Sequence, residues 1–175
     1  YHESSADGLG GKFELEQAVS KLAKWYKAFP NADVTLGNHD RIIIRKAQSS
    51  DIPSKWIKEF SEVLETPNWV YDTRFVYDGV QYIHGESGRA TKKAKDDMMS
   101  TVQGHRHTEM GTEYSVGVNH IVYGCSVGCG IDVKSYAMAY GKNFKKPAIS
   151  DDILTSDTLL NKFMLHWIGK PYKLG

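Results

Sequence analysis

The chain has 175 residues, of which 41% are hydrophobic and 25% charged, enough for one globular domain with a hydrophobic core. The formal net charge is +1, so no overall field draws the chain to nucleic acid or to a membrane, and an anion site must come from a local group of cations. The sequence has no run of about 18 apolar residues, no basic-then-apolar leader and only two cysteines, Cys125 and Cys129, which we expect to be reduced and buried; this favours the cytoplasm and predicts no membrane partner.

The first half of the chain predicts two helices and one strand. Residues 1–12 are polar and rich in glycine, which is typical of a loop. Apolar residues at helical spacing predict an amphipathic helix over 13–29 and a second helix over 53–64. Between them, the short apolar run 32–36 has a β-branched centre and predicts a buried strand.

The second half predicts two hairpins, with a helix and a strand between them. Residues 74–77 and 80–84 flank Asp78-Gly79, which is a strong hairpin signal. The later elements are an exposed helix, a short strand and the two strands of a hairpin around Asn119, over 87–100, 101–103, 113–118 and 120–123. Because helices and strands alternate along the chain, the fold class is α/β or α+β.

Three short motifs, each at or after the end of a predicted strand, hold the residues with metal-binding chemistry. They are Gly37-Asn38-His39-Asp40, His84-Gly85-Glu86 and Gly104-His105-Arg106-His107. Each motif alone is more typical of a turn or of a surface histidine, but loops at strand ends present side chains to a common crevice. Together the motifs supply nitrogen and oxygen ligands of the kind that suit Mn, Fe or Zn.

In this order, the motifs resemble the second half of the signature of calcineurin-like metallophosphoesterases. The resemblance implies a two-sheet sandwich flanked by helices, with two divalent transition-metal ions between the sheets and Mn favoured over Fe and Zn. It implies hydrolysis of phosphate mono- or diesters by a metal-bound hydroxide, with nucleotides or nucleic acid among the possible substrates. The 20-residue spacing from His84 to Gly104 is similar to that of compact phage or bacterial members.

The same resemblance implies a role for each residue of the motifs. The metal ligands would be three residues for the second metal and one for the first, in the order Asn38, His84, His105 and His107. His39 would protonate the leaving oxygen, and Asp40 would orient His39 by accepting its other N–H. Among nearby cations, Arg41 and Arg106 are the candidates for phosphate contact, because guanidinium grips phosphate bidentately.

The sequence departs from the family pattern at both ends. The family's Asp-x-His and Gly-Asp motifs, which include the bridging carboxylate, do not occur before residue 37. We therefore expect a metallophosphoesterase-like domain over 1–150 that lacks its first strand–helix–strand unit, with His2 and Glu3 as an alternative source of ligands near the metal centre. Residues 151–175 would form a helical tail or the start of a second domain, since 159–175 resemble the opening of NlpC-type cell-wall cysteine peptidases before their catalytic cysteine.

The sequence alone is consistent with three different functions. The first is a phosphoesterase whose missing ligands come from a segment outside this chain. The second is an inactive or half-site metal-binding scaffold, and the third is a fragment of a cell-wall peptidase fusion.

Overall fold

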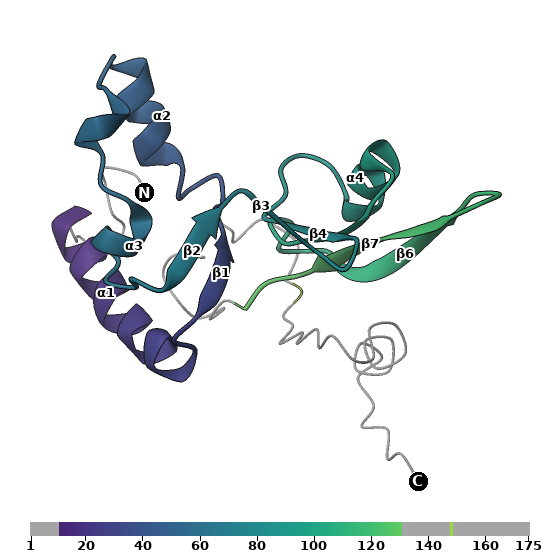
Figure 1. The fold of residues 1–175 in the computed structure, drawn as a ribbon, viewed down its shortest axis with the longest axis horizontal. Helices are drawn as coiled ribbons and strands as arrows, with labels where there is room; N and C mark the ends of the chain where they lie inside the picture. Colours follow the sequence, from purple (N-terminus) through teal and green to yellow (C-terminus); the bar gives the residue numbers. More distant parts are fainter. Residues whose placement is uncertain (1–10, 131–147, 149–175) are drawn as a thin grey trace, which may run out of the picture.

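The computed structural model describes residues 11–130 and Ala148, and this part is mixed α/β with two sheets and four helices (Figure 1). The helices are α1 (Gly11–Ala28), α2 (Ile42–Ser49), α3 (Phe60–Val63) and α4 (Ala90–Asp97), with a 3-10 turn, η1, at Ser54–Trp56. The strands are β1 (Ala32–Thr35), β2 (Trp69–Asp72), β3 (Arg74–Tyr77), β4 (Val80–Ile83), β5 (Ser100–Gln103), β6 (Met110–Val116) and β7 (Ile121–Val127). The predicted mixed class is confirmed, whereas the predictions for 1–10 and 151–175 lie outside the described residues.

The smaller sheet consists of β1 and β2, which pair in parallel and lie against α1 (Figure 1). Trp69 at the start of β2 is buried, and its indole Nε1–H donates a 2.7 Å hydrogen bond to the backbone oxygen of Phe29, just after α1. The Tyr26 ring of α1 packs at 5.9 Å from the Trp69 ring. These contacts fix β2 relative to α1. Because β1 pairs with β2, they also fix β1 and the Gly37–Asp40 motif that follows it.

The larger sheet has the strand order β3-β4-β5-β7-β6, with parallel pairs in the middle and an antiparallel pair at each edge. Its two faces differ in chemistry. One face is apolar and carries the core cluster of Val80, Val102 and Cys125. The face under α4 instead carries the fully buried Gln81 and Thr101.

The helix α4 lies so close to β7 that only glycine fits beneath it. Ala90 and Ala94 of α4 are almost completely buried, and a Cβ atom added to Gly124 would lie 2.1 Å from the backbone nitrogen of Thr91. Contacts of that length force backbone atoms to move. The helix that the sequence predicts as exposed is therefore packed on the sheet through its alanines.

Replacing Gly124 by alanine should lower the free energy of unfolding by about 3 kcal/mol, because the new methyl group must push α4 off the sheet. Urea denaturation followed by circular dichroism measures this change. Gly130→Ala is the matched control, since its Cβ would meet nothing within 4 Å, and its free energy of unfolding should stay near that of the parent. Equal stability of the Gly124 and Gly130 variants would contradict the close packing of α4 on β7.

The two sheets are joined by a side-chain hydrogen bond and separated by a cavity. The Tyr77 hydroxyl of β3 donates to the Asp33 carboxylate of β1. Beside this bond lies a cavity of about 450 Å³, lined by β1 and by apolar-face residues that include Tyr82 and Val102. The described residues thus place the expected two sheets side by side with open space, rather than packed side chains, between them.

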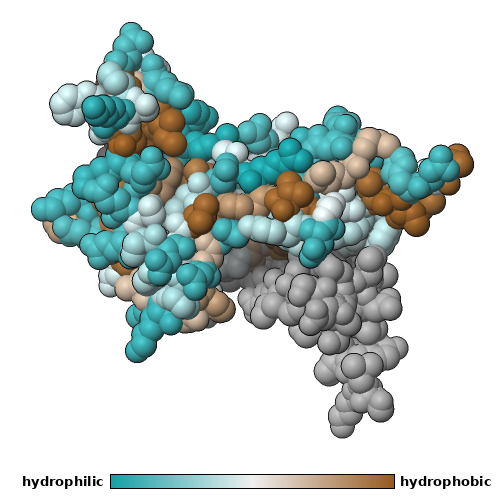
Figure 2. Space-filling model, viewed as in Figure 1, coloured by the Kyte–Doolittle hydropathy of each residue, from teal (hydrophilic) through white to brown (hydrophobic). Residues whose placement is uncertain are grey.

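Both predicted hairpins are confirmed, and the second is longer than expected. Asp78 and Gly79 have φ angles of 51° and 74°, as a tight turn between β3 and β4 requires. The β6–β7 hairpin projects beyond the rest of the sheet, and apolar side chains gather at its far end (Figures 1 and 2), where Val118 is fully exposed. Cys125 is buried in β7, as expected, whereas Cys129 is only half-buried, and no disulfide joins the two.

Two parts of the sequence prediction were wrong. The expected helix over 53–64 is broken into η1 and α3 by extended residues around Ile57 and Glu59, whose ψ angles are 125° and 148°. The sequence prediction also missed α2, whose run of isoleucines resembles a strand, and β2. Within the described residues, no helix combines the length and the apolar character needed to cross a membrane.

Candidate metal site

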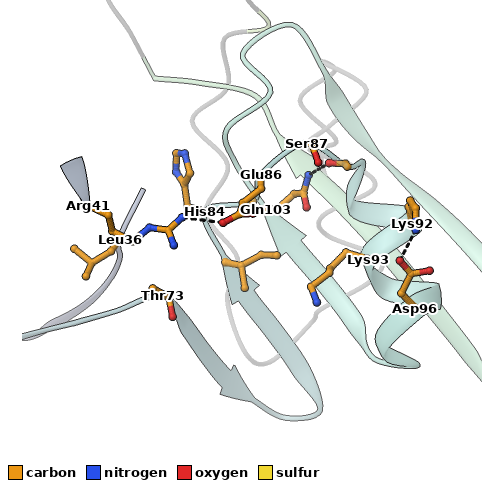
Figure 3. A pocket seen from close by; sticks show the side chains of 13 residues that line it. Leu36, Arg41, Thr73, His84, Glu86, Ser87, Lys92, Lys93, Asp96 and Gln103 are labelled. Atoms are coloured by element: carbon orange, nitrogen blue, oxygen red, sulfur yellow. Dashed lines mark hydrogen bonds and ion pairs between the residues drawn. The ribbon is translucent and has the colours of Figure 1, made fainter. Parts of the chain in front are cut away.

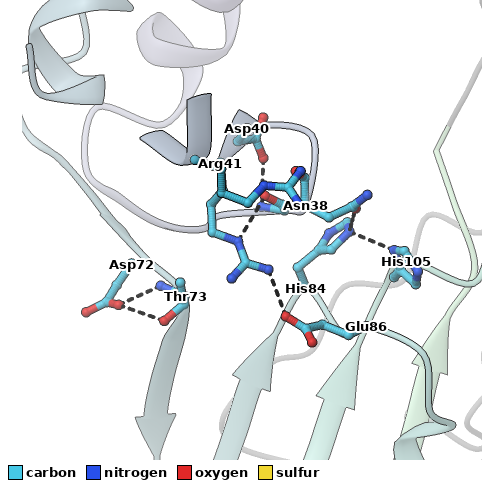
Figure 4. A network of polar contacts seen from close by, with 10 residues as sticks. Asn38, Asp40, Arg41, Asp72, Thr73, His84, Glu86 and His105 are labelled. Carbon is cyan, nitrogen blue, oxygen red and sulfur yellow. Dashed lines mark hydrogen bonds and ion pairs between the residues drawn. The ribbon is translucent and has the colours of Figure 1, made fainter. Parts of the chain in front are cut away.

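The three motifs meet between the two sheets, because each follows a strand that ends at the same edge of the structure (Figure 4). Asn38 follows β1, while His84 and His105 follow the neighbouring parallel strands β4 and β5. Parallel neighbours end at the same edge of a sheet, so both imidazoles leave from adjacent positions. The structure thus brings Asn38, His84 and His105, three of the residues that the sequence predicts as metal ligands, into contact with one another.

The converging atoms all carry lone pairs. His84 Nε2 lies 3.0 Å from Asn38 Oδ1 and 3.1 Å from His105 Nδ1, and the two imidazole rings meet edge to face with centroids 5.0 Å apart. His84 Nε2 can form a good hydrogen bond with only one of its two neighbours, Asn38 Oδ1 or His105 Nδ1. In the other contact, two electron-rich atoms lie close together without a well-aligned hydrogen between them. A cation bound among the three would remove that repulsion.

The spacing of the three atoms also fits a shared metal ion. Two ligand atoms that each lie about 2.1 Å from one ion and at right angles to each other are about 3.0 Å apart. The distances at His84 Nε2 match that value. Two imidazole nitrogens and one amide oxygen suit a borderline transition metal, so Mn, Fe or Zn fits this set.

The local electrostatics keep the two histidines in the form that binds metals. Burial lowers the pKa of His84, and the neighbouring His105, Arg41 and His107 lower it further, against an opposite effect of Asp40. Burial also lowers the pKa of His105, with further lowering from His107, Arg106 and His39. Both rings are therefore neutral at neutral pH, and a neutral imidazole is a metal ligand.

The backbone around Asn38 is held by side chains of its own motif and of α2. Asp40 Oδ2 accepts the backbone N–H of Gly37 at 2.7 Å, and Arg45 donates to the backbone oxygen of Asn38 at 3.1 Å. Arg41 Nε donates a longer hydrogen bond, of 3.4 Å, to the backbone oxygen of Gly37. These contacts fix the loop before any ligand binds, which is the usual role of groups behind a metal ligand.

Gln103 is a positioning residue that the sequence prediction missed. Its side chain is buried beneath the loop after β4, and its Nε2 donates to the Gly88 oxygen at 2.8 Å. A Cβ on Gly85 would lie 3.1 Å from the Gln103 side chain, and Gly85 has a φ of 86° that other residues avoid. A polar residue at an inward-facing position of a central strand is the signal in the sequence that points to this role.

His105 adopts a left-handed backbone conformation, with a φ of 66°. That conformation is uncommon for a residue with a side chain, although histidine adopts it more often than most residues, and it recurs at active sites and ligand-binding sites. Here it turns the ring toward His84 directly after β5 ends at Gln103. The strain and the ligand geometry therefore occur at the same residue.

The other predicted residues lie around this group rather than in it. Within residues 11–130 and Ala148, no three His, Cys, Asp or Glu side chains are close enough to hold a metal, so His107 does not join His84 and His105. His107 is exposed, and its backbone oxygen accepts the N–H of Ala148 at 2.6 Å. His39 is exposed, yet near enough to influence the pKa of His105.

The two predicted phosphate-binding arginines differ in their surroundings. Arg41 donates to Glu86 Oε1 at 2.9 Å and lines a cavity that also contacts His84. Arg106 donates one hydrogen bond to Glu109 Oε1 at 2.6 Å and one to the backbone oxygen of Ser87 at 3.2 Å. Arg41 is therefore the better placed of the two for a substrate anion, whereas Arg106 ties its loop to its neighbours.

Gly37→Ala should weaken metal binding by about tenfold or more, because its Cβ would lie 3.0 Å from the His84 ring and displace it. Isothermal titration with Mn²⁺ measures the effect. Gly104→Ala is the matched control, since its Cβ would lie no closer than 3.7 Å to any atom and should leave the affinity unchanged. An unchanged affinity in the Gly37 variant would show that the His84 ring position does not matter for binding.

Comparisons with known proteins identify no relative of this chain. No family model matches it, and no curated protein or solved structure matches it significantly. The functional argument therefore depends on the geometry of the site.

Proposed function

We propose that this chain forms the second-metal half of a two-metal phosphoesterase site and belongs to a hydrolase of phosphate mono- or diesters with a metallophosphoesterase-like fold. The observation that supports this most is that Asn38 Oδ1 and His105 Nδ1 both lie in contact with His84 Nε2. These three residues would hold the ion, with Mn favoured. When bound, such ions offset the charge of a phosphate ester and lower the pKa of a water molecule.

The residues around the ligands would then handle the phosphate and the proton. Arg41 would hold a phosphate oxygen, since its guanidinium faces the cavity beside His84. His39 would give a proton to the leaving oxygen, because a departing alkoxide needs an acid within reach. Asp40 and Arg45 would keep the Gly37–Asn38 backbone in place while the substrate binds.

The direct test is hydrolysis by the metal-loaded full-length protein. We expect Mn²⁺-dependent release of phenol from phenyl phosphate or of nitrophenol from bis-nitrophenyl phosphate. His84→Ala serves as the inactive control, because it removes the atom that the other two ligands share. Absence of hydrolysis of both the monoester and the diester with Mn²⁺, Fe²⁺ and Zn²⁺ would refute the proposal.

A half-site metal-binding scaffold is the second candidate. It is supported by the ligand set, because two histidines and an amide are all that the described residues bring together, and none of them is a carboxylate. It predicts at most one metal ion per chain, held by the same three residues. Elemental analysis of the dialysed protein separates the two candidates, since two ions per chain would exclude the scaffold.

A further inference from the structure

A second cavity, which we call the leaving-group cavity, opens beside the metal ligands (Figure 3). It has a volume of about 490 Å³ and shares the wall formed by His84. Its other walls come from the loop after β1, the turn between β2 and β3, the ends of β4 and β5, the loop after β4 and the helix α4. The cavity therefore adjoins the proposed metal site.

Cations stand on opposite sides of the leaving-group cavity. Arg41 lies on one side, and Lys92 and Lys93 of α4 lie on the other (Figure 3). Lys93 is the less exposed of the two lysines, with 46% of its side chain accessible against 70% for Lys92. Lys93 is thus the cation on this wall that loses least water when an anion enters.

Each cation that lines the cavity is paired with a carboxylate. Arg41 pairs with Glu86, Lys92 with Asp96 and Lys93 with Asp97, and Glu86 and Asp96 also line the cavity. Three cations and two carboxylates leave the lining with a net charge of +1. The Glu86 and Asp96 side chains are 73% and 53% exposed, and solvent-exposed ion pairs contribute little free energy, so an incoming anion can displace these two carboxylates. Asp97 is only 23% exposed and also accepts a hydrogen bond from Gln81, so it stays in place, and Lys93 would contact the anion with its remaining N–H groups.

The size and the lining of the cavity point to one kind of group. Pockets of 300–1,000 Å³ typically enclose a whole small molecule, so this cavity is larger than the scissile phosphate alone requires. A phosphate group presents acceptor oxygens in several directions, and here the donor-bearing side chains of Arg41 and Lys93 line opposite sides of the cavity.

We propose that the leaving-group cavity binds a second phosphate of the substrate, next to the one that is cleaved, so that the substrate is a phosphoanhydride. This inference rests on the proposed function of the metal site. Lys93 is the specificity-determining residue, and Arg41 lies between the two phosphates. In the reaction, the oxygen of water bonds to the scissile phosphorus, and the bond from that phosphorus to the bridging oxygen breaks. The bridging oxygen keeps the electron pair, and the two protons of water end on the two phosphate products.

The kinetic test compares two substrates that differ in the leaving group. Lys93→Gln should raise the KM for inorganic pyrophosphate by about tenfold, because one charge-assisted contact is lost. It should change the KM for phenyl phosphate, whose leaving group is uncharged, by less than about twofold on the same reasoning. Lys95→Gln, on the same helix but outside the cavity lining, should change neither value.

A binding measurement does not depend on turnover. Calorimetry of the full chain without added metal should show methylenediphosphonate binding that Lys93→Gln weakens about tenfold and Lys95→Gln does not. If Lys93→Gln and Lys95→Gln have equal effects, or if Lys93→Gln alters both substrates alike, the phosphoanhydride inference is wrong. Failure of the proposed function looks different, since phenyl phosphate would then not be hydrolysed at all, while calorimetry would still decide the role of Lys93.

Discussion

His84→Ala should lower the affinity for Mn²⁺ by about 100-fold or more. Replacing a residue that only hydrogen-bonds to a metal ligand already lowers metal affinity by about 10- to 100-fold, and loss of the ligand itself should cost more. The effect should be the largest of any single ligand, because His84 Nε2 is the atom that contacts both Asn38 and His105. Isothermal titration with Mn²⁺ measures the affinity, and circular dichroism checks that the fold is retained.

His120→Ala is the matched control for that experiment. His120 is exposed in the turn between β6 and β7, away from the strand ends that carry the site, so its removal should leave Mn²⁺ affinity unchanged. If the His84 and His120 variants bind Mn²⁺ equally well, the convergence of Asn38, His84 and His105 is not a metal site.

His39→Ala should separate catalysis from metal binding. A positioned acid typically contributes between about 10² and 10⁴ in rate, so kcat for phenyl phosphate should fall by that factor. The metal content per chain should stay the same, because His39 is exposed and is not one of the three converging ligands. Rate measurements and elemental analysis on the same protein sample provide both values.

Two results would count against this role of His39. An unchanged kcat would show that the leaving oxygen takes its proton elsewhere, for instance from solvent. A loss of metal in proportion to the loss of activity would make His39 a ligand instead of an acid. Asp40→Asn complements the test. Asp40 accepts a hydrogen bond from the Gly37 N–H and does not supply the proton itself, so this substitution should lower kcat less than His39→Ala does.

The contact between Asn38, His84 and His105 could be predicted from the sequence because each residue stands just after a strand. A strand end fixes the starting point and direction of the next few residues, so Asn38, His84 and His105 needed only the correct strands to meet. The two hairpins were equally predictable, since Asp78-Gly79 allows little besides a tight turn.

The supporting residues could not be predicted in the same way. Gln103 and Gln81 are polar residues at buried positions, and only the placement of α4 over that face shows what they bond to. The run Ile42-Ile43-Ile44 favours a strand by composition, but it follows the tight Gly37–Asp40 loop and continues as α2. Long-range packing decided these positions, and local propensity does not contain that information.

The leaving-group cavity also could not be predicted from the sequence. The lysines of α4 are typical of a solvated helix face, and nothing in their spacing places Lys93 opposite Arg41, 52 positions earlier in the printed chain. That arrangement arises because α4 packs on the sheet through Ala90 and Ala94 and turns Lys93 toward the loop after β4.

Anomalous diffraction from crystals of the protein grown with Mn²⁺ tests the central claim most directly. The account predicts a strong anomalous peak at bonding distance from Asn38 Oδ1, His84 Nε2 and His105 Nδ1 together. A peak elsewhere with this position empty, or no peak at all at saturating Mn²⁺, would contradict it.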